Sequence, residues 1–329
     1  MDAFPRPGYQ RENDGGKLVR AFVFPGQGAQ VIGMGRDLAD AYPAARAVFD
    51  AVDDALGERL SALIWDGDAD ELTLTANAQP ALMATSIAAT QALAAEGVAV
   101  TSAAFVAGHS LGEYSALCAA GAMRLDDTAR MLRLRGQAMQ AAVPVGEGAM
   151  AALLGLDLAA AEAVAAEAAA GGGVCQAAND NDPAQVVISG SKAAVERAVD
   201  IAKASGAKRA LLLPVSAPFH CVLMQPAADA MAEALATIEI AAPAVPVVAN
   251  VSAEAVGDPQ EIRRLLVAQV TGRVRWRESV ALMAARGVTE TVEVGAGKAL
   301  SGMIRRIARD METRAVGTAE DVRALAAAG

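Results

Sequence analysis

The sequence has only two histidines and three cysteines among its 329 residues. Two imidazoles, those of His109 and His220, are too few for a histidine-rich metal site. The cysteines at 118, 175 and 221 lie far apart and form no C-x-x-C pair, which argues against a disulfide framework and is typical of a reducing compartment. We therefore expect neither a metal centre nor a disulfide-stabilised fold.

Positive charge and long apolar runs are also scarce. The 28 lysines and arginines stand against 38 acids, and the formal net charge of −10 argues against nucleic-acid binding driven by bulk charge. The apolar stretches 82–95 and 149–170 are too short or too interrupted to cross a membrane. Residues 1–18 lack the apolar segment of a signal peptide. We predict a cytoplasmic protein in which residues 1–18 form a disordered tail.

What the sequence does contain is an alternation of short apolar strands and helices, which predicts an α/β fold. Hydrophobic residues make up 54% of the chain, enough to bury a sizeable core. Residues 143–213 are predicted to form β-α-β-α-β, a small subdomain inserted between 19–142 and 214–318, which form the large domain. Strands are predicted at 19–24, 98–106, 149–154, 186–189, 210–215, 245–251 and 288–294. Helices are predicted at 42–56, 80–95, from 113, and at 126–142, 158–170, 192–205, 225–235, 259–270, 274–286 and 321–329.

A serine stands in a pattern typical of nucleophiles. The run Gly108-His109-Ser110-Leu111-Gly112 fits G-x-S-x-G, in which two glycines let a strand reverse sharply into a helix and leave the serine exposed at the turn. The pattern is short, and a glycine-flanked serine in an ordinary tight turn is the alternative. A strand-like run before it and small helix-forming residues after it favour the nucleophile.

The serine needs a base, and the chain offers two candidates. His109 is adjacent to Ser110, and neighbouring side chains on such a segment point to different sides, so we expect His109 to be structural and His220 to be the base. No acid stands where a hydrolase triad would have one, and His220 comes too early in the chain for that order. We predict a Ser–His dyad whose imidazole is oriented by a backbone carbonyl or an amide.

One arginine lies on the apolar face of a predicted helix. At helical spacing, Arg135 shares its stripe with Thr128, Met131, Leu132 and Met139. A desolvated guanidinium is costly unless an anion meets it, and its planar fork suits a carboxylate. The sequence leaves two interpretations open: a buried salt bridge to an Asp or Glu, or a substrate that carries a free carboxylate.

A serine that attacks a carbonyl also needs donors for the oxyanion. The backbone N–H of Leu111, directly after the nucleophile, is the first predicted donor. The second is expected from the glycine-rich turn after the first strand, where Gln27 is the best candidate. This turn lacks the G-x-G-x-x-G spacing of a dinucleotide-binding loop.

Taken together, these motifs resemble the malonyl-CoA:acyl-carrier-protein transacylase family. The resemblance covers about residues 19–318, nearly everything but the tail, and as an ordered series it is highly specific. The matching segments are Phe24-Pro25-Gly26-Gln27-Gly28-Ala29-Gln30, Ala78-Gln79-Pro80-Ala81, Gly108-His109-Ser110-Leu111-Gly112-Glu113-Tyr114, Leu134-Arg135-Gly136, Asn181 ahead of Gln185-Val186-Val187-Ile188-Ser189-Gly190, residues 215–220 and Glu293-Val294-Gly295.

The resemblance implies a function and a fold. A malonyl group would move from malonyl-CoA to the phosphopantetheine thiol of acyl carrier protein by a ping-pong mechanism that supplies fatty-acid synthesis, without a metal or redox cofactor. The fold would be an α/β-hydrolase-like large catalytic domain with an inserted ferredoxin-like subdomain. We expect a monomer, and we expect the carrier to dock on local basic residues. Candidates for that patch are Lys203, Lys208, Arg209, Arg273, Arg275 and Arg277.

The resemblance also implies residue roles. Ser110 would be the acylated nucleophile, His220 its base and Arg135 the partner of the malonyl carboxylate. The backbone carbonyl of Gln269 would orient His220. The remaining assignments are the oxyanion donors Gln27 and Leu111 and the substrate-binding residues Gln79, Asn181 and Phe219. In related modular synthases, a phenylalanine before the histidine accompanies malonyl specificity.

Three other functions compete with this one. A serine thioesterase or hydrolase shares the G-x-S-x-G turn but gives no reason for Arg135 and has a later histidine. An acyltransferase of a polyketide or malonate-decarboxylase pathway is poorly separated by sequence. A scaffold that only binds carrier proteins would not need both Ser110 and His220.

Overall fold

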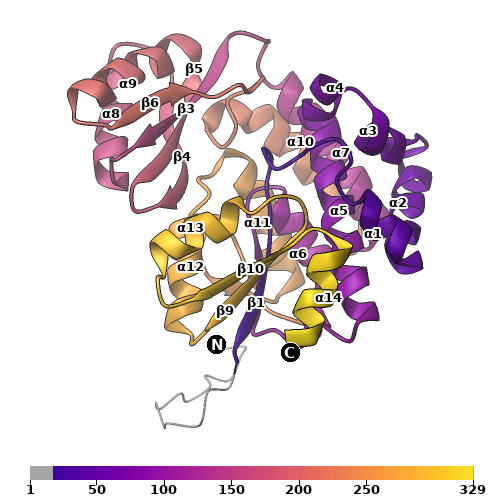
Figure 1. Cartoon of the computed structure of the whole chain (residues 1–329). Coiled ribbons are helices and arrows are strands. Elements are labelled where there is room, and N and C mark those ends of the chain that lie inside the picture. The colour runs from indigo at the N-terminus through magenta and orange to yellow at the C-terminus, as the bar shows by residue number, and fades with distance from the viewer. Residues whose placement is uncertain (1–17, 329) are drawn as a thin grey trace.

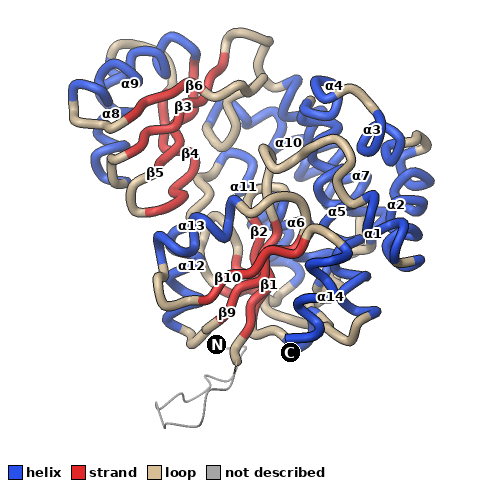
Figure 2. Tube along the Cα trace, viewed as in Figure 1, coloured by secondary structure: helices blue, strands red, loops and turns tan. Residues whose placement is uncertain are grey.

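The computed structural model describes residues 18–328 (Figure 1). The predicted tail at 1–18 therefore lies outside the described residues, apart from Leu18. Two separate sheets with helices packed against them make up the described chain, as the two groups of strands in Figure 2 show. The α/β class predicted from the sequence is confirmed.

The larger sheet has the strand order β10-β9-β1-β2-β7-β8, parallel except for β8 at its edge. Its central strand β1 is buried on both faces, as expected for a parallel sheet covered by helices. Phe22 and Phe24 belong to one core, and Ala21 and Val23 to another on the opposite face. The strands are β1 (Arg20–Phe24), β2 (Phe105–Gly108), β7 (Val247–Val248), β8 (Ala255–Val256), β9 (Glu290–Val294) and β10 (Glu312–Val316).

Helices cover both faces of this sheet (Figure 1). On one side α5 is buried along its length and contacts α2, α6, α7 and α14. On the other side α12 and α13 pack on each other and on the sheet. The helices are α1 (Arg36–Ala41), α2 (Pro43–Leu56), α3 (Leu60–Asp66), α4 (Ala69–Thr73), α5 (Thr75–Ala95), α6 (Gly112–Ala119), α7 (Leu125–Ala141), α10 (Gln225–Leu235), α11 (Pro259–Thr271), α12 (Trp276–Ala285), α13 (Ala299–Ile307) and α14 (Ala319–Ala328).

The smaller sheet is antiparallel and has the order β4-β5-β3-β6. With its two helices the segment runs β-α-β-β-α-β, the ferredoxin-like arrangement. Its buried residues form a core of their own. The exact predicted boundaries at 142–143 and 213–214 stay a prediction. The elements are β3 (Gly148–Leu154), α8 (Leu158–Ala170), β4 (Cys175–Asp182), β5 (Gln185–Ser191), α9 (Lys192–Ala204) and β6 (Arg209–Leu212).

Strand β4 was missed by the sequence analysis, which expected only β-α-β-α-β here. Its end, residues 179–182, is the run Asn-Asp-Asn-Asp, a composition typical of turns. These side chains are nevertheless buried, because Asp180 pairs with Arg277 of α12 and Asp182 with Arg306 of α13. Two backbone bonds add to the contact: the N–H of Asp180 donates to the carbonyl of Val274, and the N–H of Val274 donates to the carbonyl of Ala178. The polar strand therefore attaches the small sheet to the large part of the molecule.

Other predicted elements also differ from the structure. Of the strand expected at 98–106, only the last two residues belong to β2, which runs on to Gly108. A single 3₁₀ turn (Val100–Ser102) precedes β2. The expected strand at 245–251 shrinks to the two residues of β7. Helix α13 and strand β10 were not predicted. Helix α14 packs on α5, so the large part of the molecule continues beyond residue 318, where the sequence analysis ended the large domain.

Helix α5 starts one turn and a half before its predicted start at Pro80. Proline lacks the N–H that would bond to the carbonyl four residues earlier. That carbonyl, of Ala76, accepts a hydrogen bond from Arg133 Nη1 at 2.7 Å instead. The helix therefore continues through the proline.

None of the helices in residues 18–328 combines the length and the apolar character that a membrane crossing requires. The three cysteines are free thiols.

Candidate active site

Ser110 lies in the tight turn between β2 and α6, with a left-handed φ of +54°. The turn requires glycine at two positions, because the neighbouring backbone leaves no room there for a side chain. A Cβ on Gly108 would lie 1.9 Å from the carbonyl carbon and oxygen of Gly112, and one on Gly112 would lie 2.2 Å from the carbonyl oxygen of Phe24. Strand, turn and helix thus approach as the G-x-S-x-G pattern predicts.

The strained turn is held by Asn250, the second residue after β7. Its Oδ1 accepts the backbone N–H of Ser110 at 2.8 Å, and its Nδ2 donates to the carbonyl of Gly108 at 2.7 Å. The sequence analysis missed this residue. The available signal was its place, a polar side chain at the carboxyl end of an apolar run, where parallel strands bring functional residues together.

The hydroxyl of Ser110 and the imidazole of His220 meet across 110 residues of chain, with 2.7 Å between Oγ and Nε2. His220 lies in the loop after β6 and has a left-handed φ of +59°. A serine hydroxyl within hydrogen-bond reach of a ring nitrogen is the arrangement that nucleophilic catalysis needs.

Two backbone carbonyls face the other ring nitrogen of His220. Nδ1 lies 2.9 Å from the carbonyl oxygen of Gln269 and 3.1 Å from that of Gly272. Because carbonyls only accept, the proton of the neutral ring belongs on Nδ1, and the Nε2 lone pair faces Ser110. Burial, together with the charge of Arg135, lowers the pKa of His220 to about 3, so the ring is neutral at neutral pH.

Arg135 of α7 reaches the same point. Its Nη2 lies 3.2 Å from Ser110 Oγ and donates to Gln269 Oε1 at 2.8 Å, and its Nη1 donates to Gln79 Oε1 at 2.7 Å. The side chain is only 1% exposed and lies over the ring of Tyr114. Structure therefore brings Ser110, His220 and Arg135 together from three separate elements.

No carboxylate lies within 4.0 Å of the Arg135 guanidinium among residues 18–328, so the interpretation as a buried salt bridge is not supported. Within the described part of the chain, all its hydrogen-bond acceptors are neutral, and its buried Nε has no partner. Burial lowers the pKa of Arg135, while Tyr114 and Glu113 oppose this shift. A desolvated cation with neutral partners gains stability from an anionic ligand, the second interpretation that the sequence left open.

The predicted oxyanion donors flank the turn. Leu111 is buried and precedes α6, and Gln27 is exposed in the turn after β1. Within the described chain, neither backbone N–H donates a backbone hydrogen bond. The side chain of Gln27 accepts from Thr75 Oγ1 at 2.8 Å, and Gln79 Nε2 donates to that same Thr75 oxygen at 3.0 Å. These bonds link the turn after β1 to the pocket of Arg135.

Among residues 18–328, the side chains of Asn181 and Phe219 make no hydrogen bond to Ser110 or His220. Asn181 Oδ1 lies 2.9 Å from His109 Nε2, and His109 packs on Trp276. Burial lowers the pKa of His109. This histidine therefore joins the turn to strand β4, the structural place expected for it. Phe219 is buried in the main core, next to His220.

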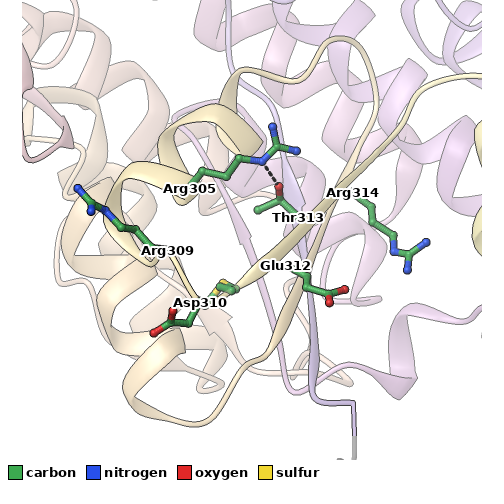
Figure 3. Close-up of a pocket in the computed structure, with 7 residues that line it drawn as sticks. Arg305, Arg309, Asp310, Glu312, Thr313 and Arg314 are labelled. Atoms are coloured by element: carbon green, nitrogen blue, oxygen red, sulfur yellow. Dashed lines mark hydrogen bonds between the residues drawn. The ribbon is translucent and has the colours of Figure 1, made fainter.

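Residues 18–328 hold no group of three or more His, Cys, Asp or Glu that could bind a metal ion. An open hollow of about 390 Å³ between α13 and β10 contains none of the predicted site residues. Figure 3 shows acids among the arginines that line it, with Arg305 donating to Thr313 at 2.7 Å. Its mixed charges offer no defined site.

Comparisons with known proteins match this geometry. A family model described as acyl transferase domain matches residues 21–329. The malonyl CoA-acyl carrier protein transacylase of Bacillus subtilis (strain 168) is 48% identical over 92% of this chain and 94% of its own length. An acyl-carrier-protein-S-malonyltransferase from Bartonella henselae superposes with a TM-score of 0.92 at 57% identity, over 94% of this chain and 99% of that one.

A third relative was solved in complex with a protein partner. It is a malonyl-transacylase bound to a type II PKS acyl-carrier protein, 42% identical with a TM-score of 0.91, over 94% of this chain and 100% of that one. The family resemblance and the fold inferred from it, a hydrolase-like large domain with a ferredoxin-like insertion, are thereby confirmed. The chain belongs to the acyl transferase domain family and, within it, to the malonyl CoA-acyl carrier protein transacylases.

Proposed function

We propose that this protein transfers a malonyl group from malonyl-CoA to the phosphopantetheine thiol of an acyl carrier protein, through a malonyl ester on Ser110. One observation carries the proposal beyond a generic serine acyltransferase: the Arg135 guanidinium, which has no carboxylate partner among the residues that the structure describes, lies 3.2 Å from Ser110 Oγ. An acyl group with a free acid at its far end satisfies this cation, because the fork can hold both carboxylate oxygens.

The first half-reaction forms the ester. His220 Nε2 accepts the proton of the Ser110 hydroxyl as Oγ attacks the thioester carbonyl. The backbone N–H groups of Leu111 and Gln27 are the proposed donors to the oxyanion. When the intermediate collapses, the C–S bond breaks, and CoA leaves as a thiol after taking the proton from His220.

The second half-reaction reverses the order. The phosphopantetheine thiol of the carrier gives its proton to His220 and attacks the malonyl ester, and Ser110 regains the proton as the C–O bond breaks. Burial lowers the pKa of His220, which favours return of the proton from the ring to the leaving group. The proposed chemistry needs no metal or redox cofactor.

The proposed partner is an acyl carrier protein, as in the solved complex of a relative. Four of the six basic residues predicted to dock it are paired with acids in the structure. Among that set, Lys208 and Arg209 remain the preferred candidates, because both are exposed beside β6. We also propose that the protein acts in the cytoplasm as a monomer, and the free cysteines support the location. The paired residues are Lys203 with Asp200, Arg273 with Glu162, Arg275 with Glu278, and Arg277 with Asp180.

The pathway has two candidates. The name of the curated relatives, malonyl CoA-acyl carrier protein transacylase, fits a supplier of fatty-acid synthesis, which we favour. The solved relative bound to a type II PKS carrier favours a polyketide pathway as the second candidate. A thioesterase would share the dyad, but it would not need Arg135.

The fate of the acyl group distinguishes transfer from hydrolysis. We expect the enzyme with malonyl-CoA and a holo fatty-acid carrier protein to yield malonyl-carrier, and to release free malonate only slowly when the carrier is omitted. The measurement follows malonyl-carrier by intact mass and malonate by chromatography. The apo carrier, which lacks the thiol, is the matched control. Fast malonate release that no carrier changes would make this protein a hydrolase.

A further inference from the structure

The side-chain amide of Gln269 connects the three residues of the proposed site. Its Oε1 accepts from Arg135 Nη2 at 2.8 Å, and its Nε2 donates to the backbone carbonyl of Ser110 at 3.0 Å. The backbone carbonyl of the same residue faces His220 Nδ1 at 2.9 Å. A shift or rotation of Gln269 would therefore disturb nucleophile, base and arginine together.

Behind this amide lies a buried carboxyl group that the proposed mechanism does not use. Glu113, in the first turn of α6, is 3% exposed. Its Oε2 accepts from Gln269 Nε2 at 2.7 Å and from the backbone N–H of Asn250 at 3.1 Å. Asn250 in turn holds the backbone N–H of Ser110. One carboxyl oxygen thus fixes the two residues that hold the rest of the site.

The contacts of Glu113 also set which way the Gln269 amide faces. An amide presents an acceptor on one side and donors on the other. With Nε2 held by Glu113, Oε1 is the atom presented to Arg135. The opposite orientation would place an N–H donor against the guanidinium and leave both groups unsatisfied, a costly arrangement in a buried site.

We propose that Glu113 is a positioning residue: by accepting from Gln269 and Asn250 it holds Gln269 in the orientation that supports Arg135 and His220. The proposal rests on the proposed function, in which Arg135 binds the malonyl carboxylate. Both contacts use Oε2 only as an acceptor. Burial raises the pKa of Glu113 to about 7, and a neutral carboxyl keeps a carbonyl oxygen to serve in the same way.

This account predicts a difference between two variants at one position. Glu113→Leu removes the acceptor but keeps a similar volume, whereas Glu113→Gln keeps an oxygen that can accept from Asn250 and Gln269. We expect Glu113→Leu to slow acylation of Ser110 by malonyl-CoA roughly 10- to 100-fold, the size of a lost bond to a charged group. Glu113→Gln should restore the rate to within about threefold of the wild type.

Rapid-quench measurements give the ratio of the acylation rates with malonyl-CoA and with acetyl-CoA. A loss of stability alone would not change this ratio. Because Glu113 acts partly through Arg135, Glu113→Leu should slow acylation by malonyl-CoA about tenfold more than acylation by acetyl-CoA. Glu290→Leu is the matched control: it removes another buried carboxylate, which pairs with Arg20 and Arg314 on the two strands that flank its own. It should lower Tm without changing the malonyl-to-acetyl ratio.

Equal losses for malonyl and acetyl in Glu113→Leu, or no loss at all, would overturn the proposal. If Glu113→Leu does not fold, Glu113→Asp replaces it, since its carboxylate is one methylene too short to keep both contacts. Glu113→Asp should then be slower than Glu113→Gln, and the reverse order would mean that charge rather than position matters. A wild type that forms no malonyl ester would overturn the proposed function itself, and is thus distinguished from a failure at Glu113.

Discussion

Replacing Arg135 by alanine is expected to slow acylation of Ser110 by malonyl-CoA about 10²- to 10³-fold, the cost of leaving a buried charge unpaired. Acylation by acetyl-CoA should change by less than about tenfold, because a neutral acyl group gains little from a cation. The physical reason is the environment of Arg135, which is 1% exposed and, as far as residues 18–328 are concerned, has only neutral hydrogen-bond acceptors. Single-turnover acylation with the two thioesters measures the ratio.

The control for this prediction stands on the same helix. Arg133 lies outside the site and bonds to Ala76 and Asn77, so Arg133→Ala should leave the malonyl-to-acetyl ratio unchanged. The rate of acylation of Arg135→Lys by malonyl-CoA should lie between those of the wild type and Arg135→Ala, because an ammonium keeps the charge but lacks the planar fork of a guanidinium. If Arg135→Ala slows both thioesters equally, the guanidinium does not recognise the carboxylate.

The second large effect is expected at His220. His220→Ala should slow acylation by about 10²- to 10⁴-fold, the usual contribution of a general base. His220 lies 2.7 Å from Ser110 Oγ, and two backbone carbonyls hold its Nδ1. The other histidine, His109, is hydrogen-bonded to Asn181 instead. Acylation measured in His109→Gln provides the comparison, and an equal loss in the two variants would contradict the assignment.

The pH dependence of the wild type follows from the same burial. With its pKa at about 3, His220 stays neutral at pH 5, so the base contributes almost no loss of rate between pH 7 and pH 5. An exposed histidine would lose about 25-fold over that range. Stability behaves oppositely to a salt-bridged histidine: as pH falls from 6.5 towards 3, the unfolded chain takes up a proton that the folded ring refuses, so His220 destabilises the fold.

Local patterns pointed to the three residues that the structure brings together. Ser110 is predicted from a five-residue pattern whose glycines are sterically required, and His220 from the scarcity of histidine. Arg135 is predicted from helical periodicity, since a cation in an apolar stripe is conspicuous. Gln269 and Gln79 have no such local signal, because amides are frequent everywhere, and only the family resemblance pointed to them.

The residues that hold the site together escaped prediction for a physical reason. Asn250 and Glu113 act on groups 140 and 156 residues away in sequence, respectively. The place of Asn250 after an apolar run is a signal for a functional residue, but no local spacing identifies its partner or that of Glu113. Strand β4 was missed likewise, because the arginines that pair with the buried Asp180 and Asp182 lie on helices distant in the sequence. Long, periodic elements such as α8 and α10 were predicted with the observed bounds.

The most direct test of the account is the position of the acyl group on the quenched enzyme. After a short reaction with malonyl-CoA, acid quenching and digestion, mass spectrometry should find one malonyl group, on the peptide that contains Ser110. Ser110→Ala should carry none, and added holo carrier should remove the group from the wild type. A malonyl group on any other side chain, or none on an enzyme that still produces malonyl-carrier, would contradict transfer through this hydroxyl.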